Sequence, residues 1–192
     1  QDELETLVLE AHRRGLKVHL DGARLFNAHI HSGLSLSALV GSFDSVSICL
    51  SKGLGAPVGS LLVSDQTIIN KAIRLRKMLG GGMRQVGVIA SCGMYALKNN
   101  IERLQQDHDN AKLLATGLSK IAELKVEYGE SQTNMVFVNC PKEHRLPLEN
   151  FLFDRKILIA SLDRGRLVCH LGVSEKDIRF VVDVFEDYFR KQ

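Results

Sequence analysis

The spacing of apolar residues predicts a helix at the start of the chain and short strands after it. Within residues 3–14 apolar positions recur every three or four residues, which indicates a helix ended by Gly15. Residues 17–20, 45–50 and 59–63 are short and rich in β-forming side chains, so we expect strands there. A helix, a glycine and a buried strand in this order indicate an α/β unit.

The rest of the chain predicts longer helices and then a smaller mixed region. We expect further helices at residues 34–40, 65–78, 84–97, 101–121, 147–155 and 174–189. We expect further short strands at residues 126–128, 135–138, 157–160 and 166–170. This change predicts that residues 1–105 belong to a large, mostly parallel sheet domain and that residues 106–192 form a small C-terminal α+β domain.

Composition and charge exclude several classes of function. The net charge is +3 and the basic residues are dispersed, so no nucleic-acid partner is expected. No apolar run approaches the ~20 residues that would span a membrane. The four cysteines have neither Cys-x-x-Cys nor zinc-ligand spacing, so we expect no metal site and reduced thiols in the cytoplasm. Because the chain begins at Gln1 rather than Met, we expect it to extend upstream, where a mitochondrial targeting segment could lie.

Two residues suited to chemistry follow two of the predicted strands. Asp21 ends the first strand, and Lys52 follows the second within a turn that contains Gly53 and Gly55. Ligands bind beyond the carboxyl ends of strands in open α/β sheets, and glycines let the backbone approach a flat ligand. Taken singly, Asp21 could be an ordinary turn residue and Lys52 a surface residue. Together they suit pyridoxal phosphate, which needs a lysine for its imine and a carboxylate beside its ring nitrogen.

Four motifs of the chain resemble the threonine aldolase family of low-specificity type, within the aromatic amino acid beta-eliminating lyase/threonine aldolase group. They are His-Leu-Asp-Gly-Ala-Arg at 19–24, Ser-Lys-Gly-Leu-Gly-Ala-Pro-Val-Gly at 51–59, Arg-Lys-Met-Leu-Gly-Gly-Gly-Met-Arg-Gln at 76–85, and Arg-Leu-Val-Cys-His-Leu at 166–171. The resemblance covers nearly the whole chain. It implies an α/β protein of the PLP-dependent transferase fold (aspartate-aminotransferase-like, fold type I), with a large domain that lacks its N-terminal part.

The resemblance also implies a role for each residue at the cofactor. Lys52 would form the imine and later carry a proton at the substrate α-carbon. Asp21 would pair with the ring nitrogen, and Arg24 would lie near the phenolic oxygen of the cofactor and the substrate carboxylate.

Substrate and partner residues follow from the downstream motifs. Arg166 would bind the substrate carboxylate as a planar fork. Arg164 competes for this role, and only the motif at 166–171 favours Arg166. Lys77 and Arg84 resemble positions that reach the cofactor phosphate or active site of a neighbouring subunit, which implies a homo-oligomer, a dimer-based tetramer. His170 lies in an apolar strand, so we expect a core histidine.

The implied reaction is retro-aldol cleavage of threonine or allo-threonine to glycine and acetaldehyde, within amino-acid metabolism. Two alternatives stay open from the sequence. One is a beta-eliminating lyase, which shares the lysine and aspartate and would release ammonia. The other is a non-catalytic fragment or degraded relative that folds with, or binds, a full-length subunit.

Overall fold

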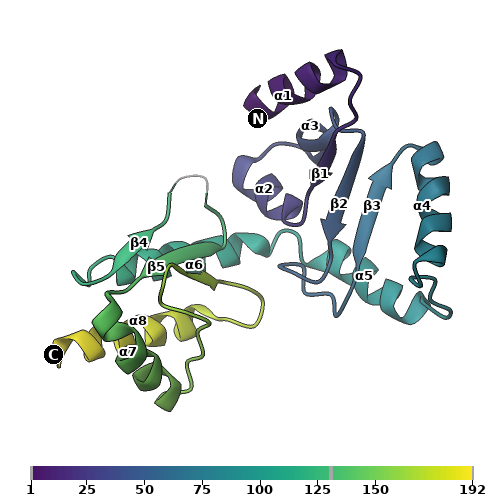
Figure 1. The fold of residues 1–192 in the computed structure, drawn as a ribbon. Helices are drawn as coiled ribbons and strands as arrows, with labels where there is room; N and C mark the ends of the chain where they lie inside the picture. Colours follow the sequence, from purple (N-terminus) through teal and green to yellow (C-terminus); the bar gives the residue numbers. More distant parts are fainter. Residues whose placement is uncertain (1, 130–131, 192) are drawn as a thin grey trace. The chain divides into compact units, whose positions relative to one another are not determined.

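The computed structural model describes residues 2–129 and 132–191, and the chain divides into two compact units (Figure 1). The first unit ends at Leu104 and the second begins at Gln105. Each has its own three-stranded sheet and its own apolar core.

The first unit places helices around a mixed sheet (Figure 1). Its elements are α1 (Asp2–Arg13), β1 (His19–Asp21), α2 (Leu25–Ser32), α3 (Leu36–Val40), β2 (Ser45–Cys49), β3 (Ser60–Ser64), α4 (Gln66–Met78) and α5 (Gly87–Asn99). The strand order is β1-β2-β3, where β1 and β2 are parallel and β2 and β3 are antiparallel. Consequently the carboxyl ends of β1 and β2 lie side by side at the same end of the sheet, which is the sheet edge meant below for Asp21 and Lys52.

Local signals set the helix ends in this unit. Gly15 follows α1 with φ of 73°, the left-handed conformation that glycine adopts readily. Asp65 caps α4, and its side chain accepts a hydrogen bond from the backbone N–H of Ile68 at 2.9 Å. The predicted end of the first helix at Gly15 is confirmed. The expected helix from residue 84 begins only at Gly87, because Gln85 has φ of 52°, which a helix cannot contain.

The apolar core of the first unit includes residues of the loop that joins β2 and β3. Its buried residues are Phe26, Leu50, Leu54, Ala56, Ala96 and Leu104. Three of these belong to the β2–β3 loop itself, and Phe26 comes from α2, a helix that the apolar spacing did not predict. The loop is therefore held by apolar packing as well as by its own backbone.

One carboxylate, Asp44, joins α1 and β1 to the start of β2. It accepts hydrogen bonds from Lys17 Nζ at 2.8 Å and from the backbone N–H of Val18 at 2.8 Å, and it pairs with His12 Nε2 at 2.8 Å. These contacts, led by Lys17, hold the pKa of the Asp44 carboxyl well below its usual range. The charged form of Asp44 therefore stabilises the first unit.

Asp44→Asn is expected to destabilise the first unit at pH 7 and to reduce the loss of stability in acid. A carboxyl whose folded pKa is depressed contributes stability above its unfolded pKa of about 3.9, and this contribution is lost as the pH falls toward the folded value. The difference in unfolding free energy between wild type and variant should shrink from pH 7 to pH 3, as measured by urea titration. Glu102→Gln, at an exposed site, is the control and should follow wild type. A constant difference would contradict the role of charge at Asp44.

The second unit packs three helices with an antiparallel sheet (Figure 1). Its elements are α6 (Leu104–Leu118), which starts at the boundary, β4 (Lys125–Glu127), β5 (Met135–Asn139), α7 (Lys142–Asp154), β6 (Gly165–Val168) and α8 (Glu175–Arg190). The strand order is β4-β5-β6, and both pairs are antiparallel. Ser174 caps α8, because its side chain and that of Asp177 form a capping box.

Two predictions for the second unit are wrong. Residues 157–160 form no strand: their apolar side chains contact the core, but the segment runs outside the sheet. After α7, Lys156 adopts φ of 64° and the Ile157 N–H returns to Leu152 O at 2.9 Å, so these residues close the helix. The helix itself begins at Lys142 rather than near residue 147, because Pro147 lies inside α7 and does not start it.

No helix within residues 2–129 and 132–191 is long and apolar enough to cross a membrane.

Candidate active site

Asp21 lies at the carboxyl end of β1, beside β2. It pairs in register with Ser47, and its carboxylate accepts a hydrogen bond from the backbone N–H of Ala23 at 3.1 Å. The next residue, Gly22, is buried, and a Cβ there would stand 2.9 Å from Ser47 O and 3.0 Å from a methyl group of Val46. The chain thus turns closely against β2 while the Asp21 residue stays exposed at the sheet edge.

Lys52 lies in the loop after β2, at the same edge of the sheet. Backbone hydrogen bonds close this loop, from Leu50 N to Gly59 O at 3.0 Å, from Ala56 N to Leu50 O at 3.0 Å, and from Gly55 N to Lys52 O at 2.9 Å. Gly55 has φ of 73°, a conformation that side chains rarely adopt. Lys52 is exposed on an ordered turn.

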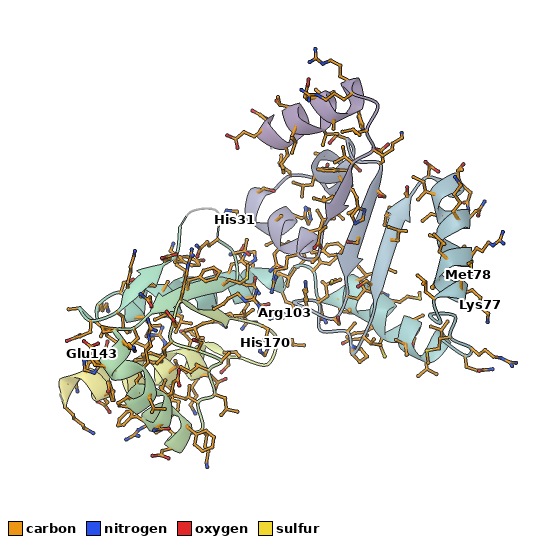
Figure 2. All side chains as sticks on the ribbon, viewed as in Figure 1. His31, Lys77, Met78, Arg103, Glu143 and His170 are labelled. Atoms are coloured by element: carbon orange, nitrogen blue, oxygen red, sulfur yellow. The ribbon has the colours of Figure 1, made fainter. Side chains whose placement is uncertain are left out.

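Two residues that lie far from Lys52 along the chain donate hydrogen bonds to carbonyl groups of the Lys52 loop. Asn100 Nδ2 donates to Leu54 O at 2.7 Å, and Arg103 Nη1 donates to Gly53 O at 3.4 Å. A Cβ on Gly53 would stand 2.8 Å from a methyl group of the buried Leu104, which would have to shift to accept a side chain there. Arg103 is labelled in the segment between α5 and α6 (Figure 2). Sequence reasoning missed these anchors, because they act across 46 and 50 residues and no local motif marks them.

Arg24, Lys77 and Arg84 are the remaining predicted site residues of the first unit. Arg24 is half-buried in the turn between Asp21 and α2. Lys77 and Arg84 flank the glycine triplet at 80–82 and are exposed. Because β3 runs antiparallel to β2 and α4 returns along β3, the end of α4 with Lys77 lies at the same end of the unit as the Lys52 loop (Figures 1 and 2).

Arg166 lies on β6 of the second unit and is exposed, opposite Phe137 of β5. Its competitor Arg164 has φ of 47° and forms an ion pair with Glu127, with Nη2 and Oε2 3.5 Å apart. Arg164 N–H also donates to Asn139 Oδ1 at 3.3 Å. Both arginines are exposed, so the choice of Arg166 stays a prediction from the motif at 166–171.

The cysteines of the second unit are poor candidates for nucleophiles. Cys140 and Cys169 are buried, and burial raises the pKa of the Cys140 thiol to about 11 and that of the Cys169 thiol to about 12. All four cysteines are free. Thiolate chemistry at Cys140 and Cys169 is therefore disfavoured at neutral pH.

The donor set at the edge of the first sheet fits the cofactor expected from the sequence. Pyridoxal phosphate requires an amine for covalent attachment and a carboxylate for its ring nitrogen. Lys52 and Asp21 supply these groups from the carboxyl ends of two adjacent parallel strands. The close turn at Gly22 leaves Asp21 at the edge rather than in the core. These residues thus provide the amine and the acid that the group needs.

Comparisons with known proteins identify the family and the fold of the chain. The family model described as "Beta-eliminating lyase" matches residues 1–141. A low specificity L-threonine aldolase of Escherichia coli O157:H7 is 48% identical over 165 residues, which are 86% of this chain and 49% of that protein. The solved Leishmania major threonine aldolase has a TM-score of 0.77 at 19% identity and is matched over 98% of this chain and 56% of that one. A structure of SPT with PLP has a TM-score of 0.69 at 19% identity, over 98% of this chain and 51% of that one.

These matches confirm the predicted fold, because the solved neighbours cover nearly the whole chain at TM-scores well above chance. The chain spans about half the length of the curated relatives it matches.

Proposed function

Because this chain belongs to the beta-eliminating lyase family, we propose that it is the lysine-bearing part of a pyridoxal-phosphate-dependent aldehyde-lyase. The proposed reaction is cleavage of threonine or allo-threonine to glycine and acetaldehyde. The observation that carries the proposal is the position of Lys52 and Asp21 at one edge of two adjacent parallel strands. The similarity to an enzyme named low specificity L-threonine aldolase supports this substrate class.

The proposal assigns roles to three residues of the first unit. The cofactor, when bound, supplies an aromatic ring that withdraws electrons from a bond at the substrate α-carbon. Lys52 attaches the cofactor through its amine and afterwards carries a proton to the α-carbon. Asp21 would keep the ring nitrogen protonated, and Arg24, three residues after Asp21 and just before α2, would lie near the phenolic oxygen and the substrate carboxylate.

Substrate and subunit contacts come from the remaining basic residues. Arg166 binds the substrate carboxylate through its planar guanidinium, which matches two oxygens at once. Lys77 and Arg84 reach toward the cofactor phosphate of a neighbouring subunit. The proposed assembly is accordingly a homo-oligomer, a dimer-based tetramer whose active sites lie at subunit interfaces.

The proposal is tested by adding pyridoxal phosphate to the purified chain. We expect an absorbance band of the lysine-attached cofactor, and after borohydride reduction we expect peptide mass spectrometry to find the added mass on the peptide that contains Lys52. Acetaldehyde release from L-threonine and L-allo-threonine tests the reaction, and ammonia release without aldehyde would indicate the beta-eliminating alternative. A spectrum identical to that of the free cofactor would show that this chain does not attach pyridoxal phosphate.

A second candidate is a non-catalytic piece that assembles with a full-length subunit. It is favoured by the apolar surface of β3 and α4, where Leu61, Leu62 and Val63 are exposed on one strand and Met78 is 70% exposed. β3 lies at one edge of the sheet that the described residues form, and a groove of about 310 Å³ runs between it and α4. Such surfaces commonly mark interfaces. Co-elution with an intact aldolase on size exclusion, without cofactor attachment to Lys52, would support this candidate.

A further inference from the structure

His170 is exposed, although its apolar surroundings in the sequence predict a core histidine, so that prediction is wrong. Its Nδ1 accepts a hydrogen bond from the backbone N–H of Gly172 at 3.1 Å. A backbone N–H can only donate, so Nδ1 carries no proton and the neutral ring has its proton on Nε2. The turn thereby fixes the ring as a hydrogen-bond donor through Nε2. His170 is labelled in Figure 2.

Buried side chains hold the backbone on both sides of this ring. Asn134 is 1% exposed; its Nδ2 donates to Cys169 O at 2.9 Å, and its own carbonyl accepts from Cys169 N at 2.9 Å. Asn110 is 3% exposed, and its Nδ2 donates to Val173 O at 3.0 Å. Two buried amides thus fix a short surface segment, the kind of support that keeps a binding side chain in one orientation.

His170 lies two residues past the end of β6 (Gly165–Val168), and the exposure pattern puts it on the same side of the chain as Arg166. The pairing of Met135 with Val168 continues by one step through the hydrogen bond between Cys169 N and Asn134 O. Across this segment Gly165 and Cys169 are buried, whereas Arg166 and His170 are exposed. Four residues at about 3.3 Å each separate the two Cα atoms by roughly 13 Å. The long arginine side chain lets both groups reach one small ligand.

We propose that His170 is a second substrate-binding residue, whose Nε2–H donates a hydrogen bond to the carboxylate of an amino acid held by Arg166. The inference rests on the proposed function, because it takes Arg166 as the carboxylate site. A neutral donor adds a charge-assisted hydrogen bond without bringing a second positive charge close to the guanidinium. The rigid segment between Asn134 and Val173 keeps that donor aligned.

Two substitutions separate binding from a role in the turn. In His170→Asn the amide oxygen takes the place of Nδ1 and can accept from Gly172 N–H, but the outward donor is lost. In His170→Gln the amide nitrogen takes the place of Nε2, whereas the turn bond is lost. Binding of glycine is measured by calorimetry in the presence of pyridoxal phosphate, with glycinamide as the ligand that lacks a carboxylate. Urea titration of each variant reports the stability of the second unit.

We expect His170→Asn to weaken glycine binding about tenfold at unchanged stability, and His170→Gln to retain most of the affinity. Glycinamide binding should be equal in wild type and both variants. Wild-type affinity in His170→Asn, with a loss only in the less stable His170→Gln, would show a turn residue and overturn the inference. Arg166→Met separates the two proposals: unchanged glycine binding in that variant, or none in wild type, contradicts the proposed function and the inference with it.

Discussion

Lys52→Ala is expected to abolish covalent attachment of pyridoxal phosphate to the chain. The attachment requires a primary amine, and the proposed site places that amine on the loop beyond β2, at the sheet edge where Asp21 ends β1. The absorbance band of the attached cofactor should disappear, and borohydride should leave no added mass on the peptide that spans the Lys52 loop. Any lyase activity of the assembled protein should fall to background, because positioning and proton transfer both depend on this residue.

The loss should not come from unfolding. The Lys52 side chain is exposed, and the contact that closes its turn is made by its backbone carbonyl, which accepts from Gly55 N–H at 2.9 Å. Removing an exposed side chain of this kind changes the unfolding free energy by about 0.5 kcal/mol or less. Lys52→Arg keeps the charge but cannot form the same bond, so it should behave like Lys52→Ala. Lys71→Ala, at an exposed position of α4, is the matched control and should keep the band.

The first strands and the two reactive residues could be predicted because their signals are local. Asp21 closes a short apolar run and Lys52 opens a glycine-containing turn, so their order along the chain already places them at one edge of a parallel pair. The anchors of the Lys52 loop could not be predicted in this way. Asn100 and Arg103 reach it from the end of α5, and nothing in their own neighbourhood indicates which carbonyl they bind.

Alternating apolar residues wrongly predicted a strand where the side chains pack on the core without backbone pairing in the sheet. Ile157 and Ile159 alternate like strand residues, and both contact the core of the second unit. The left-handed Lys156 before them turns the chain back onto α7, so the segment packs without joining the sheet. The prediction for His170 is wrong for a related reason: in the segment that follows β6 Cys169 is buried, and the next residue, His170, is exposed.

The roles of the individual site residues stay predictions. Arg24, Lys77 and Arg84 are placed by the first unit and Arg166 by the second, and each unit is described by itself. The fold puts an amine and a carboxylate at the carboxyl ends of neighbouring strands, and it leaves both Arg164 and Arg166 exposed.

Phe185→Ala is expected to cost about 3–5 kcal/mol of unfolding free energy in the second unit. Phe185 lies on α8 and is fully buried. It belongs to the same buried cluster as Leu148 and Leu152 of α7 and Val136 of β5. Truncating a buried aromatic ring removes its transfer free energy and leaves a cavity that close-packed neighbours fill only in part.

The same helix offers a control that isolates burial from helix propensity. Phe180 is 50% exposed on α8, so Phe180→Ala makes the same chemical change in the same helix. Alanine favours a helix slightly more than phenylalanine, so its effect should stay within about 1 kcal/mol. Urea titration followed by circular dichroism should shift the transition of the second unit to lower urea for Phe185→Ala and leave it nearly unchanged for Phe180→Ala. Equal shifts would mean that α8 does not pack as described. The strand β6, which carries Arg166, would then lack the core that supports it, because α8 and β6 meet the same buried cluster.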